Sequence, residues 1–212
     1  MSSYYPAFLD LKDRPVIVVG GGMVAERKVL ALLPTGAGVT VISPQLTAAL
    51  VGLEDDGAIA VRLRSYAAGD LRGAYLAVVA TDDPELNRRA AQEARQERVL
   101  VNTVDDVACC DFIAPAVVQQ GDITLAVSTN GKSPAMARYL RQRLEAFLTP
   151  DYGDLLEVLE RVRRELRRKK IRVPPERWQE AIDEKLRTLV RAGHLDEAEK
   201  RLLASLGGKA GG

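Results

Sequence analysis

A glycine-rich turn near the start of the chain has the residue types and spacing needed to hold a phosphate group. The apolar run Pro15–Val19 ends at Gly20-Gly-Gly-Met-Val-Ala25, which has the form G-x-G-x-x-A. The first glycine permits a tight turn, the second lets the backbone approach a pyrophosphate, and the small sixth residue lets a helix pack on a strand. The pattern predicts dinucleotide binding, with a plain strand-to-helix turn as the alternative. The residues concerned are Gly20, Gly22, Met23, Val24 and Ala25.

Polar residues follow three further apolar runs, at the places where strands of a parallel sheet would end. They are Ser43, Thr81 and Asn102. Ligands of open α/β sheets collect at this edge, so we expect the three side chains in a cofactor pocket. An acidic residue after the second strand is typical of NAD sites, and a nearby arginine of NADP sites. Ser43 is neither, so the choice between NAD and NADP stays open, and Ser43 could serve only the turn.

A second segment whose residues could bind a ligand begins at Ser128. Ser133-Pro134 is expected to open a helix whose free N–H groups attract anions. The cations of this segment could hold an acidic ligand, because guanidinium groups bind carboxylates in pairs of hydrogen bonds. The alternative is a helix cap at a dimer interface with solvated arginines. The residues that we assign to a substrate site are Ser128, Asn130, Lys132, Arg138 and Arg141.

The elements that must position these residues divide the chain into three parts. Over 1–112, strand and helix signals alternate, which predicts an α/β fold with a Rossmann-type parallel sheet. Over 113–150 a hairpin and a helix predict a small α+β segment, and 151–212 is expected to be a helical domain with a frayed tail from 207 on. The expected strands are 15–19, 38–42, 59–63, 75–79, 99–101, 112–118 and 123–128, and the clearest helices are 24–33, 84–96 (capped by Asp83) and 134–148.

Composition narrows the class of protein. The chain has 212 residues, a formal net charge of +1, one histidine and two adjacent cysteines, Cys109 and Cys110. These cysteines cannot form a disulfide framework or a four-ligand zinc site, and no metal-ligand spacing is visible around His194. The sequence has no apolar run of the length that a membrane span needs. We therefore expect a soluble, cytoplasmic protein with no nucleic-acid or membrane partner.

The net charge is the sum over segments of opposite charge. Acidic residues outnumber basic ones over 1–112, and basic residues outnumber acidic ones from 113 on. A neutral total therefore does not exclude a small, strongly acidic ligand.

These motifs together resemble the precorrin-2 dehydrogenases of sirohaem synthesis, some of which are also sirohydrochlorin ferrochelatases. The resemblance covers about residues 5–150 and is carried by motifs that include Ala80-Thr-Asp-Asp83 and Asn102-Thr-Val-Asp105. It is most specific in Gly20-Gly-Gly-Met-Val-Ala-Glu-Arg-Lys28 and in Ser128-Thr-Asn-Gly-Lys-Ser-Pro134. One departure is Leu33-Pro-Thr-Gly36, which should end the first helix sooner than in the family.

The resemblance implies an activity and an assembly. It implies oxidation of precorrin-2 to sirohydrochlorin with NAD as cofactor, a homodimer built by the middle segment, and ferrous iron as a possible second substrate. It places the catalytic carboxylate at Asp105, although spacing alone allows Asp106 equally, and it aligns Ser128 with a serine that some relatives phosphorylate. The alternatives are a non-enzymatic NAD(P)-sensing Rossmann regulatory module and an NAD(P)-dependent reductase of another small acid.

Overall fold

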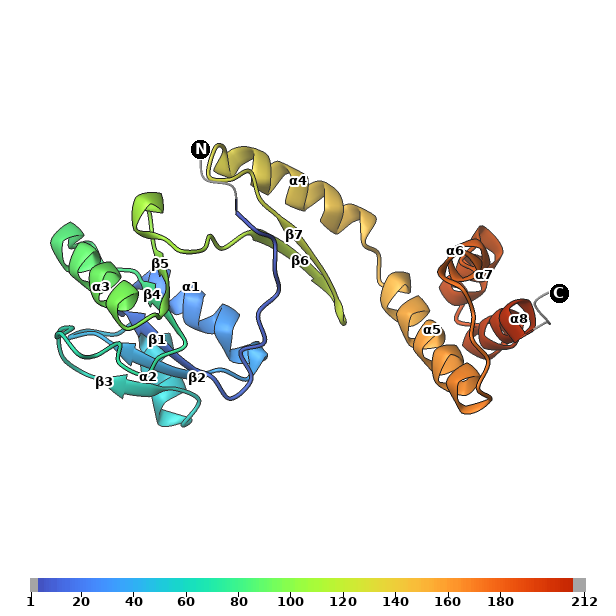
Figure 1. Cartoon of the computed structure of the whole chain (residues 1–212), viewed down its shortest axis with the longest axis horizontal. Helices are drawn as coiled ribbons and strands as arrows, with labels where there is room; N and C mark the ends of the chain where they lie inside the picture. The colour runs from blue at the N-terminus through green and yellow to red at the C-terminus, as the bar shows by residue number, and fades with distance from the viewer. Residues whose placement is uncertain (1–3, 208–212) are drawn as a thin grey trace. The chain divides into compact units, whose positions relative to one another are not determined.

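The computed structural model describes residues 4–207, which form two units (Figure 1). The first unit runs as far as Ala114 and also includes Asn130–Lys132. The second comprises Pro115–Thr129 and the chain from Ser133 on. Each unit has its own apolar core.

The first unit is built on a five-stranded, fully parallel sheet in the order β3-β2-β1-β4-β5 (Figure 1). Its central strands are apolar and, apart from the exposed Pro15, buried, as expected for a sheet covered on both faces. The predicted Rossmann-type fold is confirmed. The strands are β1 (Pro15–Val19), β2 (Gly38–Ile42), β3 (Ala60–Arg62), β4 (Leu76–Val79) and β5 (Leu100–Thr103).

Helices cover the two faces of this sheet and bury one apolar cluster on each. α1 (Met23–Leu32) packs in one cluster through Ala25 and Val29, and α3 (Pro84–Gln96) packs in the other through its alanines. Asp83 caps α3, as its sequence predicts. α1 ends at Leu32 and passes into the 3₁₀ turn η1 (Leu33–Thr35), which agrees with the early stop expected there.

α2 (Ala48–Asp55) is a helix that the sequence pattern did not predict. It has eight residues, too few to establish a helical period, and buries only Leu50 fully. Its start is fixed by Thr47, whose hydroxyl accepts a hydrogen bond from the Leu50 N–H at 3.3 Å.

The second unit begins with an antiparallel hairpin of β6 (Ala116–Gln120) and β7 (Ile123–Val127). The prediction that the first of these strands starts at residue 112 was wrong. Phe112 instead packs against the core of the first unit, and β6 continues to the tight turn at Gly121-Asp122. α4 (Pro134–Phe147) follows and is capped by the Ser133 hydroxyl, as predicted.

Four helices complete the second unit and enclose a core of their own. α5 (Asp151–Arg168) is amphipathic, with Leu155, Val158, Val162 and Leu166 buried against the helices that follow. These are α6 (Pro175–Ala181), α7 (Glu184–Arg191) and α8 (Leu195–Gly207). The break before α7, which Asp183 caps, was not predicted. Apart from Gly207, the expected frayed tail lies outside the described residues. No helix among residues 4–207 has the length and apolar character needed to cross a bilayer.

Candidate functional site

The glycine-rich turn leads from β1 into α1 with the geometry that its motif predicts. Gly20 has φ +117°, and a Cβ there would lie 2.2 Å from the Ala80 carbonyl oxygen, so only glycine fits. Gly22 is the opposite case, because a Cβ at that position would meet nothing within 4 Å. The backbone at Gly22 therefore borders open space at the carboxyl edge of the sheet, which is where a pyrophosphate would need to approach.

The N-terminus of α1 is suited to receive that anion. Gly22 is its N-cap residue and supplies no side chain to the first N–H groups of the helix. Met23 is 65% exposed, Val24 is half-buried and Ala25 is fully buried against the sheet. The small side chain of Ala25 thus allows close packing, and the N–H groups of the first turn can bind phosphate oxygens. The residues present fit a dinucleotide.

Ser43 lies beside this turn but uses its hydroxyl locally. It is buried, and its Oγ donates to the Gln45 carbonyl oxygen at 2.6 Å and accepts from the Gln45 N–H at 3.4 Å. The chain after β2 also donates from the Thr47 N–H to the Gly21 carbonyl oxygen at 3.0 Å. A Cβ on Gly21 would lie 2.1 Å from the Gln45 oxygen. Ser43 therefore shapes the loop that supports the glycine-rich turn.

Thr81 lies at the same edge, just past β4. A Cβ on Gly20 would lie 3.5 Å from its Cγ2 atom, so the two residues are neighbours. The Thr81 hydroxyl donates to the Asn87 Oδ1 atom at 2.6 Å, and the Asn87 amide donates to the Thr81 carbonyl oxygen at 3.0 Å. The structure thus brings Gly20, Gly22, Ser43 and Thr81 together at one edge of the sheet.

Asn102 and Cys110 organise the loop that follows β5. Asn102 is buried, and its amide donates to the Phe112 carbonyl oxygen at 3.0 Å. The Cys110 sulfur lies 3.1 Å from the Thr103 carbonyl oxygen and 3.2 Å from that of Asp106. Burial raises the pKa of the Cys110 thiol, which favours the protonated form that donates to one or other oxygen. The loop closes as the short 3₁₀ helix η2 (Val107–Cys109).

The sequence spacing did not distinguish Asp105 from Asp106, but the two carboxylates have different surroundings in the structure. Asp106 caps η2, because its carboxylate accepts from the Ala108 N–H at 3.1 Å, and its hydrogen bond with Cys109 raises the pKa of that thiol. Asp105 is exposed at the tip of the turn with φ +63°, a conformation that aspartate tolerates better than most residues. Among residues 4–207 its carboxylate has no hydrogen-bond partner. Asp105 is therefore available for contact with a ligand.

Lys28 is a further charged group near this loop, and it was not predicted from the sequence as a site residue. It lies on α1 and is half-buried, and its burial lowers the pKa of its ammonium group. Arg27 lowers that pKa further, whereas Cys110 and Asp105 act in the opposite direction. A cation on α1 thus interacts electrostatically with the Asp105 turn. Its position at the end of the Gly20–Lys28 motif could have indicated that it belongs to the site.

The short turn Asn130–Lys132 belongs to the first unit, and it contacts the same loop. A Cβ on Gly131 would lie 3.8 Å from the Cγ2 atom of Val107, two residues past Asp105. Asn130 and Gly131 both have positive φ, at 52° and 77°, which makes the turn tight. Lys132 is exposed there. The first unit therefore brings Asn130 and Lys132 to the loop that carries Asp105.

The other predicted substrate residues belong to the second unit. Ser128 is exposed just past β7, and Arg138 and Arg141 lie on α4. The Arg141 guanidinium pairs with Glu145 at 2.9 Å, whereas Arg138 is exposed. The Ser133 hydroxyl accepts from the Met136 N–H at 3.1 Å and so satisfies part of the α4 N-terminus. Within residues 4–207, no group of three or more His, Cys, Asp or Glu side chains gathers as a metal site.

Comparison with known proteins defines the family. Residues 7–116 match a family described as putative NAD(P)-binding, and residues 120–146 match the central part of sirohaem biosynthesis proteins. The chain is 39% identical to siroheme synthase 1 of Serratia proteamaculans over 94% of its own length and to siroheme synthase of Azotobacter vinelandii over 98%. It spans 42% and 45% of the length of these two relatives.

A solved structure extends the similarity to almost the whole chain. SirC, a precorrin-2 dehydrogenase, is 28% identical and has a TM-score of 0.73, with 93% of this chain and 100% of that one covered. The fold and the glycine-rich turn define an NAD(P)-binding protein with a Rossmann domain. The chain belongs to the family described as putative NAD(P)-binding, and its segment 120–146 matches the central part of sirohaem biosynthesis proteins. The expected family and NAD-type cofactor are thereby confirmed.

Proposed function

We propose that this chain oxidises precorrin-2 to sirohydrochlorin with NAD as the electron acceptor. The observation that carries the proposal is the match to the full length of SirC, a precorrin-2 dehydrogenase, together with the free carboxylate of Asp105 at the ligand-binding edge of the sheet. The runner-up, a module that binds NAD(P) without catalysis, gives no reason for the sirohaem-type central segment over 120–146.

NAD supplies the chemistry that side chains cannot, because it accepts a hydride. In this proposal the backbone at Gly20 and Gly22 and the first turn of α1 at Met23, Val24 and Ala25 hold its pyrophosphate. Thr81 and Asn102 contribute at the ends of β4 and β5, Thr81 beside the cofactor and Asn102 through the loop that it anchors. Ser43 borders the ribose through the turn that it shapes.

Asp105 has the role of general base in this proposal. Removal of a hydride from the reduced macrocycle leaves a proton that must go to a base, and a carboxylate without a competing hydrogen bond can take it. Asp106 is poorly suited to that role because its carboxylate already caps η2. The half-buried Lys28 on α1 brings a cation close to this carboxylate.

The substrate carries many carboxylates, which the cations of the central segment can meet. Lys132 and Asn130 lie on the tight turn against the Asp105 loop. We assign Ser128, Arg138 and Arg141 to the same substrate. Arginine suits this role because its guanidinium donates two parallel hydrogen bonds to one carboxylate. Phosphorylation of Ser128 would add negative charge and oppose binding of such a substrate.

Three further expectations belong to this proposal. Ferrous iron is a second substrate, inserted into sirohydrochlorin while Asp105 accepts the pyrrole protons. The protein acts in the cytoplasm, and it is a homodimer formed through the central segment that contains α4. An iron-insertion assay with Asp105→Ala tests the first of these, because an unchanged rate would exclude Asp105 from metal insertion.

The central experiment gives purified protein precorrin-2 and NAD and follows the absorbance of sirohydrochlorin. Asp105→Asn should lower kcat at least about 100-fold, the usual effect of losing a general base, while NAD still binds. Asp106→Asn is the matched control, and we expect kcat within about threefold of the wild type because its role is a helix cap. No sirohydrochlorin with NAD or NADP, despite dinucleotide binding, would favour the sensing module.

A further inference from the structure

The geometry points to Arg62 as a specificity-determining residue that lets this chain bind NADP as well as NAD. The inference rests on the dinucleotide binding proposed above and concerns the pocket for the adenosine ribose. It comes from the neighbouring strand β3, which sequence spacing alone does not connect with that pocket.

The end of β2 lacks the group that excludes NADP. Discrimination against the 2′-phosphate usually comes from an acidic residue here, which bonds the ribose hydroxyls and repels a phosphate. In this chain β2 is followed by Ser43-Pro-Gln-Leu-Thr47, which contains no acid. The Ser43 hydroxyl already donates to the Gln45 carbonyl oxygen at 2.6 Å. Nothing in this loop therefore repels a 2′-phosphate.

Arg62 lies directly beside this position in the sheet. It is the last residue of β3 and the register partner of Ile42. Strand β3 lies at the edge of the sheet next to β2 (Figure 1). The Arg62 carbonyl oxygen accepts from the Ser43 N–H at 3.3 Å, and the Ile42 carbonyl oxygen accepts from the Gly20 N–H at 2.9 Å. Two backbone hydrogen bonds thus connect Arg62, the end of β2 and the glycine-rich turn in one continuous edge.

A buried carboxylate holds two guanidinium groups at this edge. Asp70 is 6% exposed, and Arg64 donates to both of its oxygens, at 2.6 and 2.5 Å. Arg62 donates to Asp70 with Nη1 alone, at 2.9 Å, and its side chain is 45% exposed. One carboxylate therefore pairs with two guanidinium groups. The singly bonded Arg62 keeps donors for a further anion.

This arrangement suits a phosphate on a ribose better than a bare hydroxyl. A guanidinium binds a phosphate through two parallel charge-assisted hydrogen bonds, and Asp70 pre-orders the group so that less side-chain entropy is lost. For NAD, which has no 2′-phosphate, Arg62 has no anion to meet there. The cation should therefore strengthen NADP binding and leave NAD binding almost unchanged.

The test measures binding of NAD and NADP to the purified chain by calorimetry, without substrate. We expect the two dissociation constants of the wild type to agree within about threefold, and Arg62→Gln to weaken NADP at least about 10-fold, or about 1.4 kcal/mol, and NAD less than twofold. Arg72→Gln is the matched control, an exposed arginine of the same unit that pairs with Glu97 at 3.6 Å and lies off this edge. It should change neither constant.

Each outcome has a separate meaning. NAD binding with NADP at least tenfold weaker in the wild type, or equal weakening of both by Arg62→Gln, would overturn the inference and leave the proposed function intact. Failure of both dinucleotides to bind would instead remove the proposed function itself. Arg62→Lys separates folding from recognition: it keeps the charge beside Asp70 but loses the paired donors, so NADP binding should recover only in part.

Discussion

The sulfur of Cys110 lies within hydrogen-bond distance of both the N–H group and the carbonyl oxygen of Thr103. The Thr103 N–H donates to the sulfur at 3.2 Å, and the Thr103 carbonyl oxygen lies 3.1 Å from it. The same sulfur reaches the Asp106 carbonyl oxygen at 3.2 Å. Cys110 thus braces residues on both sides of Asp105, the tip of the turn. We infer that it positions the carboxylate by fixing the backbone of the turn that carries it.

We predict that Cys110→Ala lowers kcat for precorrin-2 oxidation about 10-fold, because a misplaced general base loses much of its effect. KM for NAD should change less than kcat, since the glycine-rich turn that holds the pyrophosphate does not depend on this loop. Cys110→Ser should restore part of kcat, because a hydroxyl can make the same hydrogen bonds at shorter range. A general loss of stability would instead change both constants.

Cys109→Ala provides the comparison for this series. Cys109 is adjacent in sequence, but its thiol interacts with the Asp106 carboxylate and not with the backbone around Asp105. We expect kcat near that of the wild type. Equal losses in the two alanine variants, measured by steady-state kinetics, would show that Cys110 has no special positioning role.

Substitutions at Gly22 and Gly21 of the motif should have different effects on binding and stability. Gly22→Asp places a carboxylate in open space at an ordinary φ of −85°, so the variant should fold with its melting temperature nearly unchanged. NAD affinity should fall at least about 100-fold, because a like charge beside the pyrophosphate costs several kcal/mol. Calorimetry measures the affinity, and retained affinity would contradict the assigned turn.

Gly21→Ala should show the opposite result. Its Cβ would lie 2.1 Å from the Gln45 carbonyl oxygen and 2.7 Å from the Ser43 Oγ atom, and backbone cannot move aside as a flexible side chain can. We expect a loss of about 3 kcal/mol in the free energy of unfolding, at the upper end for overpacking. Chemical denaturation of the two variants side by side separates a binding defect from a packing defect.

Asp70 should make the first unit sensitive to acid. Hydrogen bonds from Arg64, and then from the Ala67 N–H, hold the pKa of this carboxyl at about 2, against an ordinary value of 3.8. Because the pKa is lowered in the folded state, the ionised group stabilises the fold above pH 4, and this contribution is lost as the pH falls through 4 toward 2.

The contribution of Asp70 is roughly 1 to 2 kcal/mol, since a pKa unit corresponds to about 1.4 kcal/mol and both guanidinium partners are half exposed. Asp70→Asn should therefore lower the free energy of unfolding at pH 7 and flatten its dependence on pH between 4 and 2. Urea denaturation across that range is the measurement. Parallel curves for wild type and variant would exclude this role.

Local patterns in the sequence predicted the elements that depend on local chemistry. The strand before Gly20, the Asp83 cap and the Ser133 cap were all expected, because a turn or a helix start depends on a few consecutive residues. α2 was missed because its eight residues carry little periodicity, and β6 was placed too early because the apolar run from Phe112 belongs partly to the other core.

The unpredicted parts of the candidate site are contacts through space. Spacing could not separate Asp105 from Asp106, because the difference lies in which carboxylate caps η2. It could not connect Arg62 with Ser43 either. These residues are 19 positions apart in the sequence and become neighbours only because β2 pairs with β3. Pairing order, and not local composition, brings these groups together.

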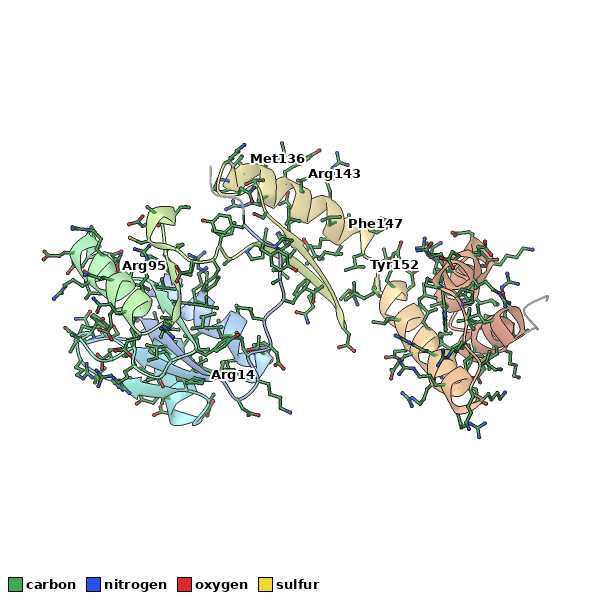
Figure 2. All side chains as sticks on the ribbon, in the orientation of Figure 1. Arg14, Arg95, Met136, Arg143, Phe147 and Tyr152 are labelled. Atoms are coloured by element: carbon green, nitrogen blue, oxygen red, sulfur yellow. The ribbon has the colours of Figure 1, made fainter. Side chains whose placement is uncertain are left out.

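α4 presents an apolar face that the chain itself leaves exposed. Met136, Tyr139, Leu140 and Phe147 are 50%, 49%, 39% and 60% exposed, and the helix has no fully buried residue. Figure 2 shows Met136, Arg143 and Phe147 along this helix. The spacing of Met136, Leu140 and Phe147 aligns them on one helical face, and such a surface is typical of a protein interface.

If the proposed homodimer forms through this face, Leu140→Asp should weaken it by more than about 100-fold, because a central apolar anchor becomes a buried charge. Light scattering on the eluting protein should then show a monomer with unchanged secondary structure. Gln142→Asp is the control, since it adds the same charge to an exposed position nearly opposite Leu140 on α4. A dimer that persists in Leu140→Asp would place the interface elsewhere, and a wild-type monomer would contradict the homodimer itself.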